Sequence, residues 1–143
     1  MTRINVVPVE ELSDQHLIAE YRELPRAVKQ NFDLTDAPKK YVLGKGHVKW
    51  ARKHIHYVLL RYHDIYYEML YRNFKPNYTF NDLLMYATAD WYREGLLIID
   101  DYYQVTDKDI QLNRQRLIEK YKLKPNFYRW TKRNKPEWIL KGE

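Results

Sequence analysis

One stretch near the amino terminus combines arginines with a carboxylate at helical spacing. Gln15, Ala19, Arg22 and Arg26 follow one another at four-, three- and four-residue steps, so they share one face if the segment is a helix. Glu23 lies beside that face. Guanidinium groups bind phosphate oxygens through paired hydrogen bonds. A carboxylate among arginines stays ionised, which suits a general acid/base or the stabilisation of a developing cation.

The same residues also allow a plainer interpretation. It is a solvated helix face on which Glu23 pairs with Arg22 or Arg26. Arg3 adds a third guanidinium close to the start of the chain, which favours phosphate binding. Other carboxylates of this segment have the same chemistry on composition alone: Glu10, Glu11 and Glu20. Their position relative to a nucleophile has to decide between them and Glu23.

The element that positions these residues is expected to be a helix that begins after Ser13. Serine is a favoured N-cap, because its hydroxyl accepts a hydrogen bond from a backbone N–H of the first turn. Apolar residues then recur at helical spacing: Leu17, Ile18, Tyr21, Leu24 and Val28. Pro25 lies inside this pattern. It removes one backbone hydrogen bond, so we expect a kink rather than the end of the helix.

A second, longer helix should begin near Gly46, with an apolar stripe that runs to Met69. A third helical stretch is expected from Thr79 through Trp91, ended by Gly95. Residues 96–99 (LLII) fit either a buried connector or a short strand.

Thr106 and Asp109 resemble a capping box at the start of the last helix, although Asp stands where Glu or Gln is usual. Its inward residues should be Ile110, Leu117, Ile118 and Tyr121. An irregular tail rich in aromatic and basic residues follows Pro125. The patterns together predict an all-α fold, a single compact domain over residues 1–143 with about three to four helices and a kinked first helix.

Composition narrows the class of protein. The chain has no cysteine, which excludes disulfides and thiolate metal sites. No apolar run approaches the ~20 residues that span a bilayer, and the first residues lack the apolar region of a signal peptide. We therefore expect a cytoplasmic monomer that does not bind membranes.

Charge indicates a polyanionic partner. The net charge is +6 and the isoelectric point is about 9.3, and nucleic acid is the commonest polyanion that basic proteins bind. The 14 tyrosines and four tryptophans either fill the core or stack on unpaired bases.

Several motifs extend this hypothesis to a known family. Residues 2–5 (TRIN), 14–17 (DQHL) and 19–26 (AEYRELPR) closely resemble the phage family of pyrimidine-dimer DNA glycosylase/AP lyases, the UV endonuclease V type. Residues 43–48 (LGKGHV) and 125–130 (PNFYRW) are similar to later segments of that family. The resemblance implies a partner, damaged double-stranded DNA, and a reaction, the excision of UV-induced cyclobutane pyrimidine dimers.

The resemblance also implies a mechanism. After removal of Met1, the α-amine of Thr2 attacks the sugar C1′ at the 5′ pyrimidine and forms an imine, or Schiff base. β-Elimination then cuts the strand. Glu23 matches the catalytic carboxylate of the family. The family's DNA-contacting and further active-site positions match Arg3, His16, Arg22 and Arg26.

An α-amine suits this role because its reference pKa of about 7.7–8.0 lies well below the ~10.4 of lysine. A larger fraction of it is therefore neutral and nucleophilic near neutral pH. We expect no cofactor and no metal, because the five histidines and the carboxylates do not fall at recognisable ligand spacings. His47 stands in a Gly-Lys-Gly-His loop whose glycines allow close approach to a phosphate, so we expect it to contact the DNA backbone.

The tail allows two interpretations. Phe127, Tyr128 and Trp130 either pack the carboxyl terminus onto the core or, together with Arg129, rest against the lesion and its phosphates. The local similarity favours DNA binding for these four residues, as it does for Gln15.

Two other functions remain open at this point. Residues 49–105 share only helical character with the family, which allows an AP lyase or a glycosylase for other damaged bases. A non-catalytic DNA-binding module is the other alternative. The presence of both Thr2 and Glu23 argues against that module, because binding alone needs neither.

Overall fold

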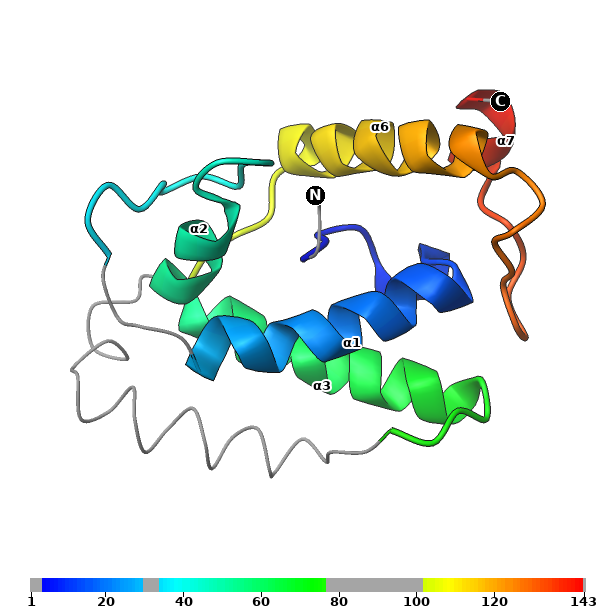
Figure 1. Cartoon of the computed structure of the whole chain (residues 1–143), viewed down its shortest axis with the longest axis horizontal. Coiled ribbons are helices and arrows are strands. Elements are labelled where there is room, and N and C mark those ends of the chain that lie inside the picture. Colours follow the sequence, from blue (N-terminus) through cyan, green and yellow to red (C-terminus); the bar gives the residue numbers. More distant parts are fainter. Residues whose placement is uncertain (1–3, 30–33, 77–101, 143) are drawn as a thin grey trace.

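A computed structural model describes residues 4–29, 34–76 and 102–142 of the chain, with the side chains of residues 26–29 left aside. These ranges contain the 3-10 turn η1 (Val9–Glu11) and five α-helices. The helices are α1 (Asp14–Lys29), α2 (His47–Lys53), α3 (Ile55–Tyr71), α6 (Asp107–Leu123) and α7 (Glu137–Gly142). No strand occurs within the described ranges, so the all-α prediction is confirmed (Figure 1).

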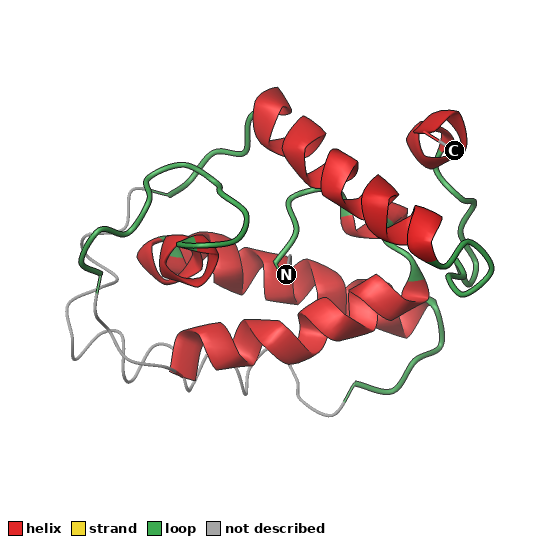
Figure 2. Ribbon diagram, turned by 45° about the horizontal axis from the view of Figure 1, so that its top comes forward, coloured by secondary structure: helices red, strands yellow, loops and turns green. Residues whose placement is uncertain are grey.

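The described helices enclose residues 4–7. α1 and α3 pack side by side, and α6 lies across from them. Residues 4–7 run between α6 and α1 in both views (Figures 1 and 2). They contribute Ile4, Val6 and Val7 to the same buried core as α1, α2, α3 and α6. Residues 4–7 are therefore an internal element of the fold.

The predicted start of α1 is confirmed. The Ser13 hydroxyl accepts a hydrogen bond from the His16 backbone N–H at 3.2 Å, which is the geometry of an N-cap. The helix continues past Pro25 to Lys29, so the proline does not end it.

The prediction of one long helix from Gly46 to Met69 is wrong. The segment forms two helices, α2 and α3, that meet at His54, whose backbone leaves helical geometry (φ −116°, ψ 61°). The His54 side chain is buried, and its Nε2 lies 3.0 Å from the Lys39 carbonyl oxygen. The break therefore lets α3 pack along α1 while α2 holds the preceding loop.

That loop depends on two glycines. Gly44 and Gly46 have positive φ angles of 73° and 90°, which residues other than glycine rarely adopt. A Cβ atom on Gly46 would also lie 2.9 Å from Cγ of Pro38. The loop thus closes tightly and delivers His47 to the first position of α2.

The capping box predicted for the last helix is also confirmed. The Asp109 N–H donates to the Thr106 hydroxyl, and the Asp109 carboxylate accepts from the Thr106 N–H, both at 3.1 Å. Leu117 and Tyr121 face the core. The sequence patterns did not predict η1 or the short α7, which packs against α6.

The predicted helix from Thr79 through Trp91, its end at Gly95 and the connector at 96–99 lie outside the described residues. Among the helices that are described, none combines the length and the apolarity needed to cross a membrane.

Candidate active site

Side chains from several helices hold the backbone of residues 4–7, here called the N-terminal segment. The Ile4 N–H donates to Nε2 of His47 at 3.1 Å, and the Ile4 carbonyl accepts from the Tyr41 hydroxyl at 3.0 Å. The Tyr57 hydroxyl donates to the Asn5 carbonyl at 2.7 Å. Every one of these polar backbone groups would need water if the segment were exposed, so the side chains replace that water.

His47 has a fixed protonation state in this arrangement. Because Nε2 accepts the Ile4 N–H, the proton is on Nδ1, which donates to the Val42 carbonyl at 2.7 Å. The side chain is only 2% exposed. Burial lowers the pKa of His47, against the opposing effects of its Val42 hydrogen bond and of the Glu20 and Glu23 carboxylates. The ring is thus a neutral acceptor that faces the chain start.

Asn113 of α6 holds the other half of the segment. Its Oδ1 accepts the N–H groups of both Val6 and Val7, at 2.7 and 3.1 Å. Its Nδ2 donates to Oδ1 of Asn5 at 2.8 Å, and Asn5 in turn donates to Glu20 at 2.9 Å. One amide side chain therefore satisfies two consecutive backbone donors and connects α6 to α1.

A buried ion pair between Glu20 and Arg61 completes the set of side chains that hold the N-terminal segment. We call this set the clamp: Glu20, Tyr41, His47, Tyr57, Arg61 and Asn113. Glu20 of α1 is 0% exposed and accepts Nε of Arg61 from α3 at 2.8 Å. Arg61 also donates to the Val7 carbonyl. Burial alone would lower the pKa of Arg61, but the Glu20 carboxylate outweighs burial and raises it. The Glu20 carboxylate therefore has a structural role: it accepts hydrogen bonds from Arg61 and Asn5 and is not a candidate general base.

Of the glutamates between residues 4 and 25, Glu11, Glu20 and Glu23 are at least partly buried. Glu11 accepts hydrogen bonds from Arg114 and Trp138, and Glu20 is enclosed as described. Glu23 is half-buried on α1, and its carboxylate acts on the pKa of His47. The charge of Glu23 therefore acts on the same imidazole that accepts the Ile4 N–H. Arg22 is exposed on the same helix.

The C-terminal tail, residues 124–136, is fastened to the first turn of α1. The Gln15 side chain donates to the Phe127 carbonyl at 2.9 Å and accepts the Arg129 N–H at 3.1 Å. The Asp14 N–H donates to the Arg129 carbonyl at 2.7 Å. These contacts leave the Phe127 and Arg129 side chains exposed.

Aromatic rings reinforce this junction. Tyr128 stacks on His16 with ring centres 4.9 Å apart and planes 6° apart, and Tyr121 meets the same imidazole edge-on. The Trp130 indole donates to the Glu11 carbonyl at 3.0 Å. Burial, helped by Lys120, lowers the pKa of His16 to about 4. His16 is therefore neutral near neutral pH and acts in the free protein as a stacking surface.

An ionic network anchors the far end of the tail. Buried Arg72 of α3 pairs with Asp14 at 2.9 Å and with Glu68 at 2.8 Å. Asp14 also accepts the Thr131 hydroxyl at 2.6 Å, and Glu68 accepts Arg133 at 2.8 Å. Burial raises the pKa of Glu68, but Arg133 and Arg72 outweigh it and hold that pKa below the ordinary value. The tail is thus tied to α1 and α3.

The residues predicted as a site form two groups. Gln15, His16 and the tail residues meet at the start of α1, whereas His47 contacts Ile4 and Glu23 acts electrostatically on His47. Both ring nitrogens of His47 are engaged inside the protein, so its expected contact with the DNA backbone would come from the loop backbone. Thr2, Arg3 and the side chain of Arg26 lie outside the described residues.

Sequence reasoning missed the clamp residues. Arg61 and Asn113 each occupy an inward position among apolar residues of a helix, next to Tyr62 and four residues before Leu117. A polar side chain at such a position signals a buried hydrogen bond. That signal was present, but it does not identify the partner.

Within the described ranges, no three His, Asp or Glu side chains gather closely enough to hold a metal ion.

Residues 1–82 match the family model described as pyrimidine dimer DNA glycosylase. The match includes the N-terminal segment and α1 to α3, and it ends before α6 and the tail. A glycosylase of this kind is a DNA-repair enzyme, and its substrate is damaged DNA. With more than half of its length in the match, the chain belongs to the pyrimidine dimer DNA glycosylase family.

Proposed function

We propose that the protein is a bifunctional DNA N-glycosylase/AP lyase whose nucleophile is the α-amine of Thr2, exposed by removal of Met1. The nitrogen bonds to C1′ of the 5′ nucleotide of a cyclobutane pyrimidine dimer, and the bond from C1′ to the base breaks. The base takes up a proton and stays joined to the 3′ pyrimidine through the cyclobutane ring, and the sugar ring opens to a protonated imine. Loss of a C2′ proton then breaks the C3′–O bond, and the 3′ phosphate leaves. Water hydrolyses the imine and restores the amine.

The observation that best supports this proposal is the grip on Ile4. His47 and Tyr41 hold the N–H and carbonyl of a residue only two positions from Thr2. Successive Cα atoms are about 3.8 Å apart, so the Thr2 Cα stays within about 7.6 Å of the Ile4 Cα. A fixed Ile4 thus limits where the amine can travel. Holding a nucleophile in place lowers the entropic part of a reaction barrier.

The reference pKa of an α-amine also makes it a better nucleophile than a lysine near neutral pH. With a reference pKa of about 7.7–8.0, roughly a third of it is neutral at pH 7.5, against ~0.1% of an unperturbed lysine. This step needs no metal ion or cofactor.

Glu23 is the proposed partner of the amine. A carboxylate near C1′ stabilises the positive charge that develops on the sugar and on the imine. It also accepts and returns protons during ring opening and elimination. The effect of its charge on His47, which holds the Ile4 N–H, supports this role, whereas Glu20 is enclosed by Arg61 and Asn5.

The DNA would lie over the exposed side of α1, the chain start and the tail. Arg3, Arg22 and Arg26 are the proposed phosphate contacts, with Arg129 from the tail. Tyr128 stacks on His16, Phe127 meets Tyr128 edge-on, and Trp130 packs against Tyr121, so these rings offer a surface where a distorted base step can rest. Gln15 holds the tail in that position.

Borohydride trapping tests the proposal, because it reduces an imine to a stable covalent link. The purified protein is incubated with UV-irradiated, abasic and undamaged duplexes, with and without borohydride. We expect trapped protein on the first two duplexes and none on the third. Trapping on the abasic duplex alone would replace the proposal with an AP lyase. No trapped protein on any duplex would leave a DNA-binding protein without imine chemistry.

The amino terminus is a separate control. An intact mass that lacks Met1 is expected for active protein, because Thr2 carries an amide nitrogen while Met1 is attached. A preparation that retains Met1 should give no trapped species. If it trapped DNA as efficiently as the processed protein, the nucleophile would lie elsewhere.

A further inference from the structure

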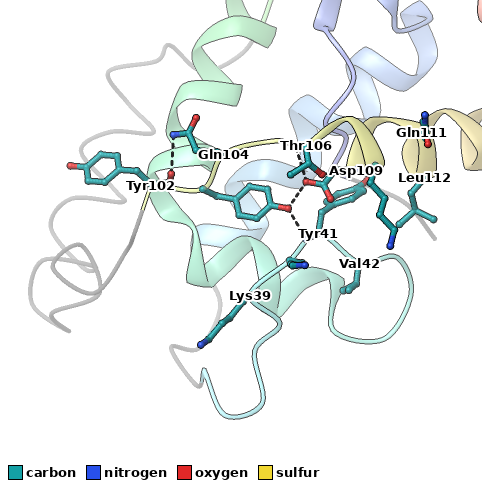
Figure 3. Close-up of a pocket in the computed structure, with 12 residues that line it drawn as sticks. Lys39, Tyr41, Val42, Tyr102, Gln104, Thr106, Asp109, Gln111 and Leu112 are labelled. Carbon is teal, nitrogen blue, oxygen red and sulfur yellow. Dashed lines mark hydrogen bonds between the residues drawn. The ribbon is translucent and has the colours of Figure 1, made fainter.

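The loop that leads into His47 is fixed against α6. Its residues 39–42 line a pocket beside the first turns of that helix (Figure 3). The Tyr41 N–H donates to the Tyr103 hydroxyl oxygen at 3.0 Å, and that hydroxyl donates to the Asp109 carboxylate of α6. The loop backbone that meets the His47 imidazole therefore has a defined position.

Two contacts from this region restrict the chain on both sides of Ile4. Nε2 of His47 accepts the Ile4 N–H at 3.1 Å, and the Tyr41 hydroxyl donates to the Ile4 carbonyl at 3.0 Å. Because a peptide unit is planar, each contact restricts the orientation of a whole plane, and with it the direction in which the chain enters Ile4. The soft backbone dihedral angles of Thr2 and Arg3 are then what separates this held plane from the proposed nucleophile.

The two contacts respond differently to a proton. The Tyr41 hydroxyl stays a donor near neutral pH, because burial raises the pKa of Tyr41. The neutral imidazole of His47 accepts at Nε2, because Nδ1 carries the proton and donates to the Val42 carbonyl. A second proton would lie on Nε2 and face the Ile4 N–H, so two donors would oppose each other. The contact of His47 is therefore the one that acid breaks.

Several groups set the charge of this imidazole. Those that face it come from the loop, α1, α2 and the chain start: Tyr41, Val42, Glu20, Glu23, Trp50 and the amino group of the chain. Burial lowers the pKa of His47 and outweighs the Val42 hydrogen bond and the two carboxylates, which raise it; the charged amino group also lowers it. Arg61 of α3 pairs with Glu20 at 2.8 Å and offsets that charge. The ring is therefore neutral near neutral pH and gains its second proton in acid.

We infer that His47 is a positioning residue for the proposed reaction: its neutral Nε2 holds the Ile4 N–H and thereby keeps the Thr2 amine in place. The inference rests on the proposed nucleophile. It adds a requirement that the amine alone does not impose, because both the amine and the imidazole must be without their extra proton. The reaction should therefore lose rate in acid more steeply than the amine alone would cause.

The first test compares His47→Ala with His47→Gln. A glutamine side chain places an amide oxygen, an acceptor that does not titrate, near the position of Nε2. In single-turnover cleavage of an abasic duplex at saturating DNA and pH 7.5, we expect His47→Ala to lose about 10- to 100-fold in rate. DNA affinity should change little, and His47→Gln should recover most of the rate.

The control for this comparison is His63→Ala, at an exposed position of α3, which should cleave at the wild-type rate. A wild-type rate in His47→Ala would overturn the inference. Equal losses in His47→Ala and His47→Gln would also overturn it, because the acceptor would then not be what matters.

A pH profile is a readout that a purely structural role would not move. Deprotonation of one amine, with a reference pKa of about 7.7–8.0, gives a slope of about 1 for log rate against pH in acid. A second required deprotonation, at His47, raises the slope towards about 2 in the wild type. His47→Gln should keep the slope of the amine alone, and Glu23 is common to both proteins. The same slope in both proteins would overturn the inference.

Nuclear magnetic resonance of the free protein tests the contact without DNA. We expect the Ile4 amide signal and the His47 ring signals to shift with the same midpoint as the pH falls. An Ile4 amide that does not respond while His47 titrates would overturn the inference. The two proposals fail separately. No trapped species on abasic DNA at any pH would remove the Thr2 nucleophile, whereas trapping with equal slopes in wild type and His47→Gln would remove only the role of His47.

Discussion

The two ends of the chain are held in opposite ways. Residues 4–7 lie inside the protein, and buried side chains from distant parts of the chain satisfy their backbone groups. The C-terminal tail lies on the surface, where its backbone and a few side chains are fastened to α1 while Phe127 and Arg129 remain exposed. The difference matches two tasks. A nucleophile needs a fixed position, whereas a DNA-contacting surface needs accessible charge and rings.

The largest effect should come from Glu23→Gln, which keeps the shape of the side chain and removes its charge. We expect strand cleavage and trapping to fall by about 10²- to 10⁴-fold, the range of general acid/base contributions. DNA affinity should change little, because Glu23 is not a phosphate contact. Single-turnover cleavage and equilibrium binding are the measurements, with Glu137→Gln on exposed α7 as control. Normal cleavage by Glu23→Gln would exclude Glu23 as the catalytic carboxylate.

The clamp itself is broken by Arg61→Met. This variant leaves the Glu20 charge buried without its ionic partner and releases the Val7 carbonyl. Removal of one partner of a buried pair costs about 3–5 kcal/mol, so the free energy of unfolding should fall by that order. Urea unfolding measures the loss. The double variant Arg61→Met/Glu20→Gln should recover part of the stability. If the single variant lost less than about 1 kcal/mol, the clamp would be dispensable.

Acid should loosen the junction between α1 and the tail. His16 has a folded-state pKa of about 4, below the ~6.5 of an unfolded histidine. Above about pH 6.5 His16 is neutral in both the folded and the unfolded chain. Between about pH 6.5 and 4 only the unfolded chain binds the proton, so the free energy of unfolding falls as the pH falls. The loss reaches about 3 kcal/mol, and His47 acts in the same direction.

Unfolding curves at pH 7, 5.5 and 4.5 measure this loss. His16→Phe keeps a ring for Tyr128 and removes the titrating group, so its stability should depend less on pH in this range. The same pH dependence in wild type and His16→Phe would show that the buried histidine is not responsible.

The smallest effect is expected from Gln15→Ala, which removes two hydrogen bonds between α1 and the tail backbone. Exposed hydrogen bonds contribute little, so stability should fall by about 1 kcal/mol. DNA affinity should fall severalfold because the tail is held less firmly, while the rate at saturating DNA stays unchanged. Gln115→Ala, on the exposed face of α6, is the control. A large loss of rate at saturation would mean that Gln15 belongs to the catalytic group.

Local features of this fold were predictable from the sequence. The N-cap Ser13 and the capping box of Thr106 and Asp109 join residues three positions apart, and such short-range chemistry is readable from spacing. The break at His54 was not predictable from spacing, because apolar residues continue at helical intervals across it. A contact of His54 with the Lys39 carbonyl, set by the fold of the loop, decides the geometry there.

The residue pairs of the buried clamp could not be predicted from the sequence for a related reason. Arg61 and Glu20 are 41 positions apart, and Asn113 lies 107 positions from Val6. A polar residue in an apolar stripe indicates that a partner exists, but topology determines which one it is. The candidate residues Thr2 and Glu23 came from the family resemblance, and the contacts that fix Ile4 supply a physical reason for the role proposed for Thr2.

The most direct test of this account is to identify the atom that carries the DNA. The species trapped by borohydride on a dimer-containing duplex is digested with protease and nuclease and sequenced by tandem mass spectrometry. The expected product is a peptide that begins at Thr2, lacks Met1 and carries the reduced sugar on its α-nitrogen. A sugar on the Nζ atom of a lysine such as Lys45, with an unmodified Thr2, would contradict it.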